Sequence, residues 1–129
     1  MIQAERADFV SVPVRDLDRA SDFYGGTLGL PKSRGWSERW REYELGNVSL
    51  ALIPIEMLGR EEHTPNTAPI AIRVADVAAA REKLEAAGVK FPVETIDSGV
   101  CHIAPFRDPD GNALQRHRRY APFSDGSLP

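Results

Sequence analysis

The chain has 129 residues, of which 42% are hydrophobic and 27% charged, proportions typical of a globular domain with a substantial core. A net charge of −3 and a pI of about 5.6 exclude a general positive field for nucleic acid or anionic membranes. No apolar run is long enough for a membrane span, and the single Cys101 excludes an intrachain disulfide and a cysteine-based zinc site. We therefore expect a cytoplasmic protein with neither nucleic-acid nor membrane partners.

A strand followed by a helix is predicted near the start of the chain, and the same pair recurs 60 positions later. Valines alternate along 9–14, and isoleucines and valine repeat that alternation along 69–74. Asp16 and Asp76 stand where a helix needs an N-cap, and apolar residues at helical spacing follow each. Gly88 is placed to end the second helix. The pattern predicts two modules in which each helix covers the valine or isoleucine face of its sheet.

Shorter strands are predicted after each helix, and DPDGN at 108–112 is predicted to form a structural turn before the last of them. The strand candidates are 34–45 and 47–55 in the first module and 90–96, 100–106 and 112–119 in the second. The resulting fold class is α+β, with two βαβββ modules forming a curved sheet around a cavity and helices outside. We expect a single domain over 1–129, with module one at about 8–55, a linker at about 56–67 and module two at about 68–119.

Three motifs together indicate a family: VRDLDRASDFYGGTLGL, VADVAAAREKLEAAGV and FRDPDGNALQ. They resemble the vicinal oxygen chelate superfamily, which contains glyoxalase I, extradiol dioxygenases and bleomycin-resistance proteins, and the resemblance covers about 8–122. It implies paired βαβββ modules around a cavity that a second chain often completes, so a homodimer is expected. It also implies, for metal-dependent members, a divalent ion held by His and Glu side chains from the first and last strand of each module.

The positions that this resemblance assigns to metal ligands carry unsuitable side chains. They are Phe9 and Pro69 in the first strands, Gln115 in the last strand, and a counterpart near Ala51 in module one. Phenylalanine, proline and alanine cannot ligate a metal, and glutamine offers only a neutral carbonyl oxygen. We expect no cofactor, with a divalent metal as the disfavoured alternative.

The last strand places Gln115 and His117 on one face, which is the cavity side if Leu114 packs under the helix. The alternative for His117 is the exposed end of the strand. On 100–106 we expect His102, Ala104 and Phe106 on the cavity face if Cys101, Ile103 and Pro105 face the helix. His102 then binds or protonates a polar ligand, or is an ordinary structural histidine.

The stretch WSERWREY contributes an aromatic candidate. Trp36 and Trp40 have the same parity and would share one face of an extended strand. They would form a wall that stacks a planar or cationic ligand, with Glu38 or Glu44 balancing charge. The alternative is packing at a dimer interface or over the sheet.

We predict a metal-free protein that binds a small organic molecule and sequesters a drug or toxin. Catalytic residues are unassigned, and whether the chain is an enzyme stays open. The alternative is a metal-dependent lyase, isomerase or dioxygenase of the same fold, with a shifted site built from His102, Gln115, His117 and a glutamate such as Glu44, or acid–base chemistry through His102. A third reading is a dimeric module whose cavity its own side chains fill. The predicted ligand-binding residues are Phe9, Trp36, Trp40, Glu44, His102, Phe106, Gln115 and His117.

Overall fold

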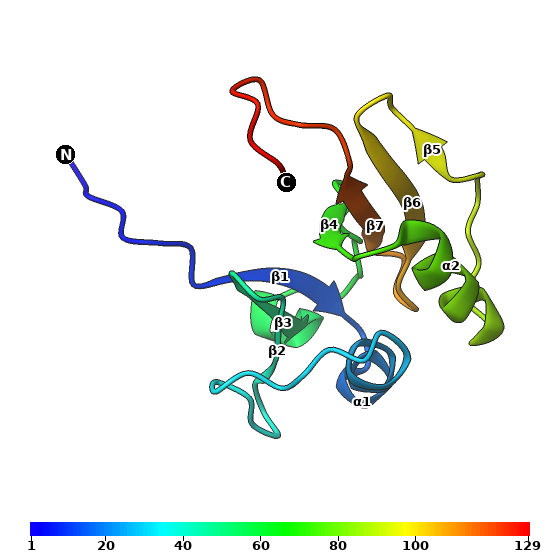
Figure 1. Ribbon diagram of the computed structural model, residues 1–129. Coiled ribbons are helices and arrows are strands. Elements are labelled where there is room, and N and C mark those ends of the chain that lie inside the picture. Colours follow the sequence, from blue (N-terminus) through cyan, green and yellow to red (C-terminus); the bar gives the residue numbers. More distant parts are fainter. The chain divides into compact units, whose positions relative to one another are not determined.

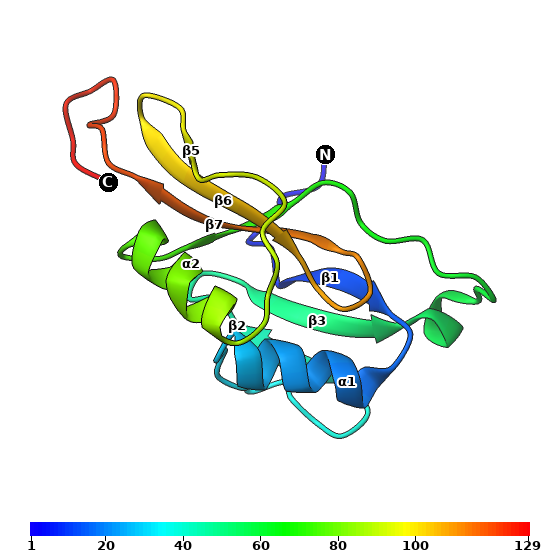
Figure 2. The ribbon, with the colours of Figure 1, turned by 90° about the vertical axis from the view of Figure 1, so that its right-hand side faces the viewer.

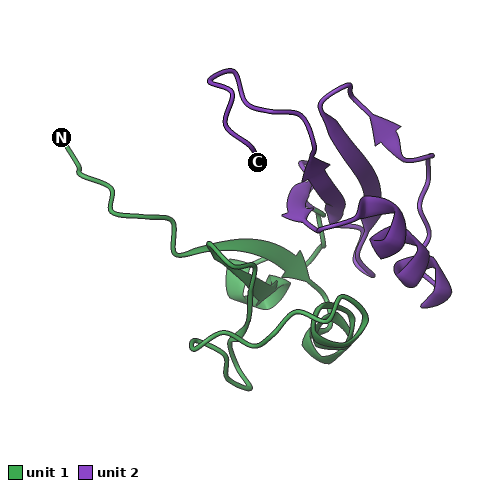
Figure 3. Ribbon diagram, in the orientation of Figure 1, with its two compact units in different colours: residues 1–65 green, residues 66–129 purple.

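The computed structural model describes residues 1–129 and divides them into two compact units, unit 1 (1–65) and unit 2 (66–129), coloured separately in Figure 3. The boundary falls inside the stretch 56–67 that the sequence marks as a linker. Each unit contains one sheet with a helix against one of its faces (Figures 1 and 2), so the predicted α+β class is confirmed. No helix combines the length and apolar character that crossing a bilayer would need.

Unit 1 contains a three-stranded sheet in the order β1-β3-β2, with β1 parallel and β2 antiparallel to β3. The carboxylate of Asp16 caps the helix by accepting a hydrogen bond from the Arg19 backbone N–H at 2.9 Å, as the sequence predicts. The elements are β1 (Phe9–Val14), α1 (Leu17–Ser21), a π-helical continuation η1 (Asp22–Thr27), β2 (Arg41–Glu44), β3 (Ser49–Pro54) and a 3-10 turn η2 (Ile55–Leu58).

Unit 2 contains a four-stranded sheet in the order β4-β7-β6-β5, in which only β4 and β7 run parallel. Asp76 caps the helix through the Ala79 N–H at 3.0 Å. Gly88, at φ +91°, ends it and donates its N–H to the Glu85 carbonyl at 3.0 Å. The elements are β4 (Ile70–Arg73), α2 (Val77–Ala86), β5 (Ile96–Asp97), β6 (Cys101–Arg107) and β7 (Ala113–Arg119). The strand expected at 90–96 is therefore much shorter than predicted, since β5 begins only at Ile96.

The core of each unit lies between its sheet and its helix, on what we call the helix face of the sheet. In unit 1 this face carries Val12 and Leu52, which are aligned across β1 and β3 and fully buried. In unit 2 it carries Leu114 and Phe106, aligned across β7 and β6, together with Ile72 from β4. The apolar alternation that the sequence shows in the first strand of each module therefore does point toward the helix.

Candidate functional site

The parallel strand pair of each unit fixes which residues of the two modules correspond. Ser11 of β1 aligns with Ala51 of β3, and Ala71 of β4 aligns with Gln115 of β7. Ser11 and Ala71 are 60 positions apart, the offset of the repeat. Ala51 is therefore the counterpart of Gln115 in the first module, as the sequence suggests.

The chemistry at these corresponding positions does not fit a divalent ion of the kind that the resemblance implies. Phe9, Ala51 and Pro69 have no donor atom in their side chains, and Gln115 supplies one neutral oxygen. Within residues 1–129, no three His, Cys, Asp or Glu side chains gather into a group that could hold a metal.

The register of β6 against β7 reverses the predicted face assignment in β6. Gln115 aligns with Pro105, and His117 aligns with Ile103. Residues aligned across a ladder point to the same side of the sheet, so His102 and Phe106 lie on the other, helix face. The expectation that His102 and Phe106 share the face of Gln115 is wrong, because hairpin register sets the parity and the sequence alone does not reveal it.

Phe106 belongs to the core of unit 2. Its side chain is 2% exposed, and its ring centroid lies 5.4 Å from that of Phe91, which follows α2. The predicted place of Phe106 on a cavity face is therefore corrected, because its side chain is buried in the core on the helix face.

The same register separates the residues of the predicted shifted metal site. His102 lies on the helix face, whereas Gln115 and His117 lie on the opposite face of the same sheet. Side chains on two sides of a sheet cannot converge on one ion. The combination of these three residues as a shifted site is therefore wrong.

Gln115 and His117 do lie together on the face opposite the helix. Both are half-buried, and the residues aligned with them on β4 are Ala71 and Arg73. The main-chain carbonyl of His117 accepts the Val74 N–H at 3.0 Å, which fixes the strand but leaves the imidazole on the sheet surface. The predicted pairing of an amide and an imidazole on one face is confirmed.

The two tryptophans of unit 1 do not share a strand face. Residues 33–40 fold into turns, in which the Trp36 N–H donates to the Ser33 carbonyl at 3.1 Å and the Ser37 N–H donates to the Trp40 carbonyl at 2.8 Å. The Lys32 ammonium lies 3.6 Å above the Trp36 ring. The predicted extended wall of both tryptophans is therefore wrong, because β2 begins only at Arg41.

Trp40 instead pairs with Phe9. The ring centroids are 5.4 Å apart at an interplanar angle of 78°, an edge-to-face contact. The Trp40 indole Nε1 donates to a carboxylate oxygen of Glu42 at 3.0 Å, and the Ser33 hydroxyl donates to the other oxygen. Glu44, on the same face of β2, accepts a hydrogen bond from the Ser49 hydroxyl at 3.0 Å.

Trp40's partners Phe9 and Glu42, together with Glu44, line a pocket of about 470 Å³ in unit 1, whereas Trp40 itself is not part of the lining. Its polar wall includes Glu42, which sequence reasoning missed although it has the same parity as Trp40 and Glu44. Gly35 leaves room for the Glu42 carboxylate, because a Cβ at that position would displace this carboxylate from its place beside Ser33 and Trp40. The lining residues are Arg6, Ala7, Asp8, Phe9, Ser33, Arg34, Gly35, Glu42, Glu44, Gly46, Asn47, Val48 and Ser49.

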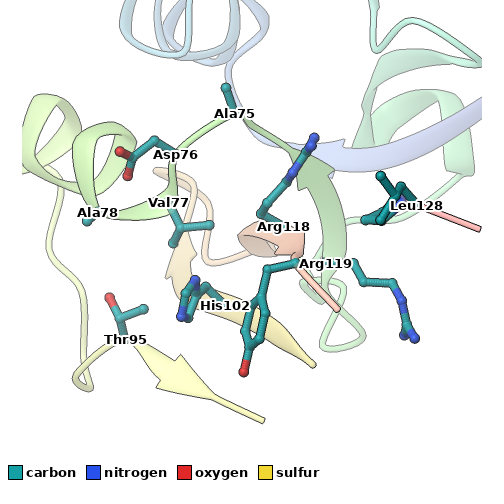
Figure 4. Close-up of a pocket in the computed structure, with 11 residues that line it drawn as sticks. Ala75, Asp76, Val77, Ala78, Thr95, His102, Arg118, Arg119 and Leu128 are labelled. Atoms are coloured by element: carbon teal, nitrogen blue, oxygen red, sulfur yellow. The ribbon is translucent and has the colours of Figure 1, made fainter. Parts of the chain in front are cut away.

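A second pocket of about 690 Å³ lies in unit 2, on the helix face of its sheet (Figure 4). Of the predicted site residues, only His102 lines it. Its Nε2 is 3.5 Å from a carboxylate oxygen of Asp97, and its ring centroid is 4.7 Å from that of Tyr120. The remaining lining residues are Ala75, Asp76, Val77, Ala78, Thr95, Arg118, Arg119, Leu128 and Pro129.

Asp97 anchors this cluster as a carboxylate. The Gly99 N–H and the Tyr120 hydroxyl donate to it, and together with His102 they lower the pKa of Asp97. The same hydrogen bond raises the pKa of Tyr120. At neutral pH the cluster therefore contains an ionised Asp97 that holds the Tyr120 hydroxyl and faces the His102 imidazole.

Known proteins resemble the chain over nearly its whole length. The family model described as Glyoxalase/Bleomycin resistance protein/Dioxygenase superfamily matches residues 6–115. No curated protein sequence matches the chain significantly.

Solved structures add the following similarities. TnmS3, an antibiotic binding protein from Streptomyces sp. CB03234, has 26% identity and a TM-score of 0.73, with 92% of this chain and 99% of that chain covered. A glyoxalase/bleomycin resistance protein from the same strain has 28% identity and a TM-score of 0.67, with 88% of this chain and 100% of that chain covered. A glyoxalase/bleomycin resistance protein/dioxygenase from Nocardioides has 20% identity and a TM-score of 0.75, with 100% of this chain and 93% of that chain covered. At this identity the similarity supports the fold.

Proposed function

The chain belongs to the Glyoxalase/Bleomycin resistance protein/Dioxygenase superfamily, and on that premise we propose that it binds a small organic molecule without a metal and sequesters it. One observation carries the proposal. Phe9 stands at a position where the metal-dependent members are expected to have a ligand, and its ring meets Trp40 edge-on beside a pocket. An aromatic side chain at that position can contact an organic guest but has no lone pair with which to coordinate a metal ion.

The pocket of unit 1 supports a particular kind of guest. Phe9 offers an aromatic surface, being 45% exposed even with Trp40 against it. Glu42 and Glu44 offer carboxylate oxygens, and a pocket of about 470 Å³ falls within the range of small-molecule sites. A guest with a ring system and a hydrogen-bond donor, such as an amine or hydroxyl, would use both.

The similarity to TnmS3, an antibiotic binding protein, supports binding over catalysis as the leading function. A cytoplasmic location is part of the proposal. A homodimer is also part of it, because the resemblance implies a cavity that a second chain often completes.

Replacing Phe9 by alanine is expected to weaken guest binding about tenfold, because the lost aromatic contact is worth roughly 1.4 kcal/mol. The guest is first identified by a thermal-shift screen of antibiotics with aromatic ring systems, since a ligand that binds only the native state raises its melting temperature. Affinities are then compared by calorimetry. Phe123→Ala is the matched control, because Phe123 is also 45% exposed but lies outside the unit 1 pocket. Equal weakening by both variants would count against the proposed site.

Metal dependence is tested on the same protein. After expression in medium containing Fe, Mn, Zn and Ni, the purified protein is expected to contain substoichiometric metal by mass spectrometry, and EDTA is expected to leave guest affinity unchanged. Stoichiometric metal together with a chelator-sensitive affinity would contradict a metal-free function.

A further inference from the structure

We propose that the pocket of unit 2 is a second, separate binding site, and that it takes a small monocarboxylic acid with an apolar body. The superfamily's ligand positions, including Gln115, lie on the face opposite the helix, whereas this pocket lies on the helix face at the start of α2. The inference goes beyond the proposed function, which rests on the pocket of unit 1.

Two strands bring the polar side chains of the pocket together. His102 of β6 aligns with Arg118 of β7, so both point to the helix face. Figure 4 shows both beside Val77, with the His102 ring on the side of Thr95 and the Arg118 guanidinium on the opposite side, pointing away from His102. The pocket therefore has a cationic group and an imidazole separated by an apolar floor.

Arg118 is the group that selects an anion. Within residues 1–129 its guanidinium has neither a hydrogen bond nor an ion pair, although it lines the pocket and is only half-exposed. The neighbouring Arg119, by contrast, donates to the carbonyls of Ala121 at 2.9 Å and Pro122 at 2.8 Å. A guanidinium fork with unused donors matches the two oxygens of a carboxylate.

His102 supplies the second polar contact. Asp97 faces its Nε2 at 3.5 Å, and the Tyr120 ring stacks on it at 4.7 Å, so the imidazole is held from two sides. Nδ1 has no partner among residues 1–129 and can meet a hydroxyl or carbonyl of the guest. Its 46% exposed side chain stays accessible from solvent.

The remaining lining limits the guest to one negative charge and an apolar body. Val77, Ala75, Ala78 and Leu128 give an apolar surface. Asp76 contributes a carboxylate that already serves as the helix cap through the Ala79 N–H. Its charge would repel a dianion such as phosphate, while Arg118 balances a single carboxylate.

The test uses 2-naphthoate as the probe, titrated by calorimetry into the full chain. We expect saturable binding that Arg118→Gln weakens about tenfold or more, since hydrogen bonds to charged groups contribute on the order of a factor of ten. His102→Gln is expected to weaken it roughly threefold. The Arg118 side chain makes no hydrogen bond or ion pair within residues 1–129, so Arg118→Gln should keep the melting temperature of the protein, which circular dichroism checks.

Two controls remove the same charge elsewhere. Arg73→Gln lies on the opposite face of the same sheet, aligned with His117, and Lys83→Gln lies at the last turn of α2. Both are expected to bind 2-naphthoate as the unchanged protein does. Inorganic phosphate and the neutral 2-naphthalenemethanol are expected to bind at least tenfold more weakly.

Absence of 2-naphthoate binding, or unchanged affinity in Arg118→Gln, would overturn this inference. A loss in Arg73→Gln equal to that in Arg118→Gln would also overturn it, as would phosphate binding as tightly as 2-naphthoate. None of these results depends on the antibiotic screen, and Phe9→Ala should leave 2-naphthoate binding unchanged. Each of the two proposed sites can therefore be refuted without refuting the other.

Discussion

Replacing Phe106 by alanine is expected to lower the free energy of unfolding by about 3–5 kcal/mol, the range for deleting a buried aromatic ring. The side chain is 2% exposed and packs against Phe91 beneath α2. Truncation leaves a cavity between helix and sheet that the closely packed surroundings cannot fill completely. Urea unfolding followed by circular dichroism measures the loss.

Two further variants make the Phe106 result specific. Phe106→Leu should cost much less, about 1 kcal/mol, because it keeps most of the apolar volume. Phe9→Ala should cost much less stability than Phe106→Ala, since Phe9 is 45% exposed and lies outside the core. If Phe106→Ala instead kept full stability and lost guest affinity, Phe106 would be a ligand contact as the sequence suggested, and its placement in the core would be wrong.

Replacing Asn112 by alanine is expected to lower the free energy of unfolding by about 2–4 kcal/mol, because a fully buried side chain loses two hydrogen bonds together. Asn112 is fully buried, its amide donates to an Asp108 carboxylate oxygen at 2.8 Å, and its carbonyl accepts the Asn66 N–H at 2.9 Å. These bonds tie the DPDGN turn to the segment that enters β4. The turn predicted from Pro109 and Gly111 is thus also a buried junction.

The control for Asn112 is Asn47→Ala, which removes an exposed asparagine from the turn between β2 and β3. It should change the unfolding free energy by less than about 0.5 kcal/mol. A similar small effect of Asn112→Ala would mean that the buried bonds contribute nothing net, contrary to the burial argument.

Local chemistry made several features predictable. The two caps, Asp16 and Asp76, and the helix end at Gly88 depend on neighbouring backbone groups within a few residues. The alternation in β1 and β4 identifies the helix face because period two is a property of any strand. The same logic made Gln115 and His117 neighbours on one face.

Hydrogen-bond register decided what the sequence left open. The alternation along 101–107 is ambiguous, with Cys101, Ile103 and Pro105 as apolar as Ala104 and Phe106. Pairing with β7 resolved it and moved His102 to the helix face, beside Arg118. The short β2 likewise follows from the turns at 33–40, which the alternation along 34–45 does not predict. In this arrangement the Trp40 indole donates a hydrogen bond to the Glu42 carboxylate.

The burial of Arg116 could not be predicted from the composition of its segment. The stretch RHRRY resembles an ordinary strand end, yet Arg116 shares the parity of Leu114 and is only 7% exposed, with its guanidinium 5.9 Å from the Phe106 ring. Burial lowers the pKa of Arg116 by disfavouring its charged form. The sequence shows that Arg116 and Leu114 lie on the same face of the strand. Whether that face is buried depends on the helix that packs against it.

The sequence by itself determined the duplicated βα pattern, the helix caps, the superfamily and the unsuitability of Phe9, Ala51, Pro69 and Gln115 as metal ligands. These follow from residue chemistry and from contacts that are local or repeated. Only the tertiary structure decided which residues line the two pockets. Strand register and turn geometry join residues far apart in the chain, and a shift of one position would exchange the two faces of a sheet.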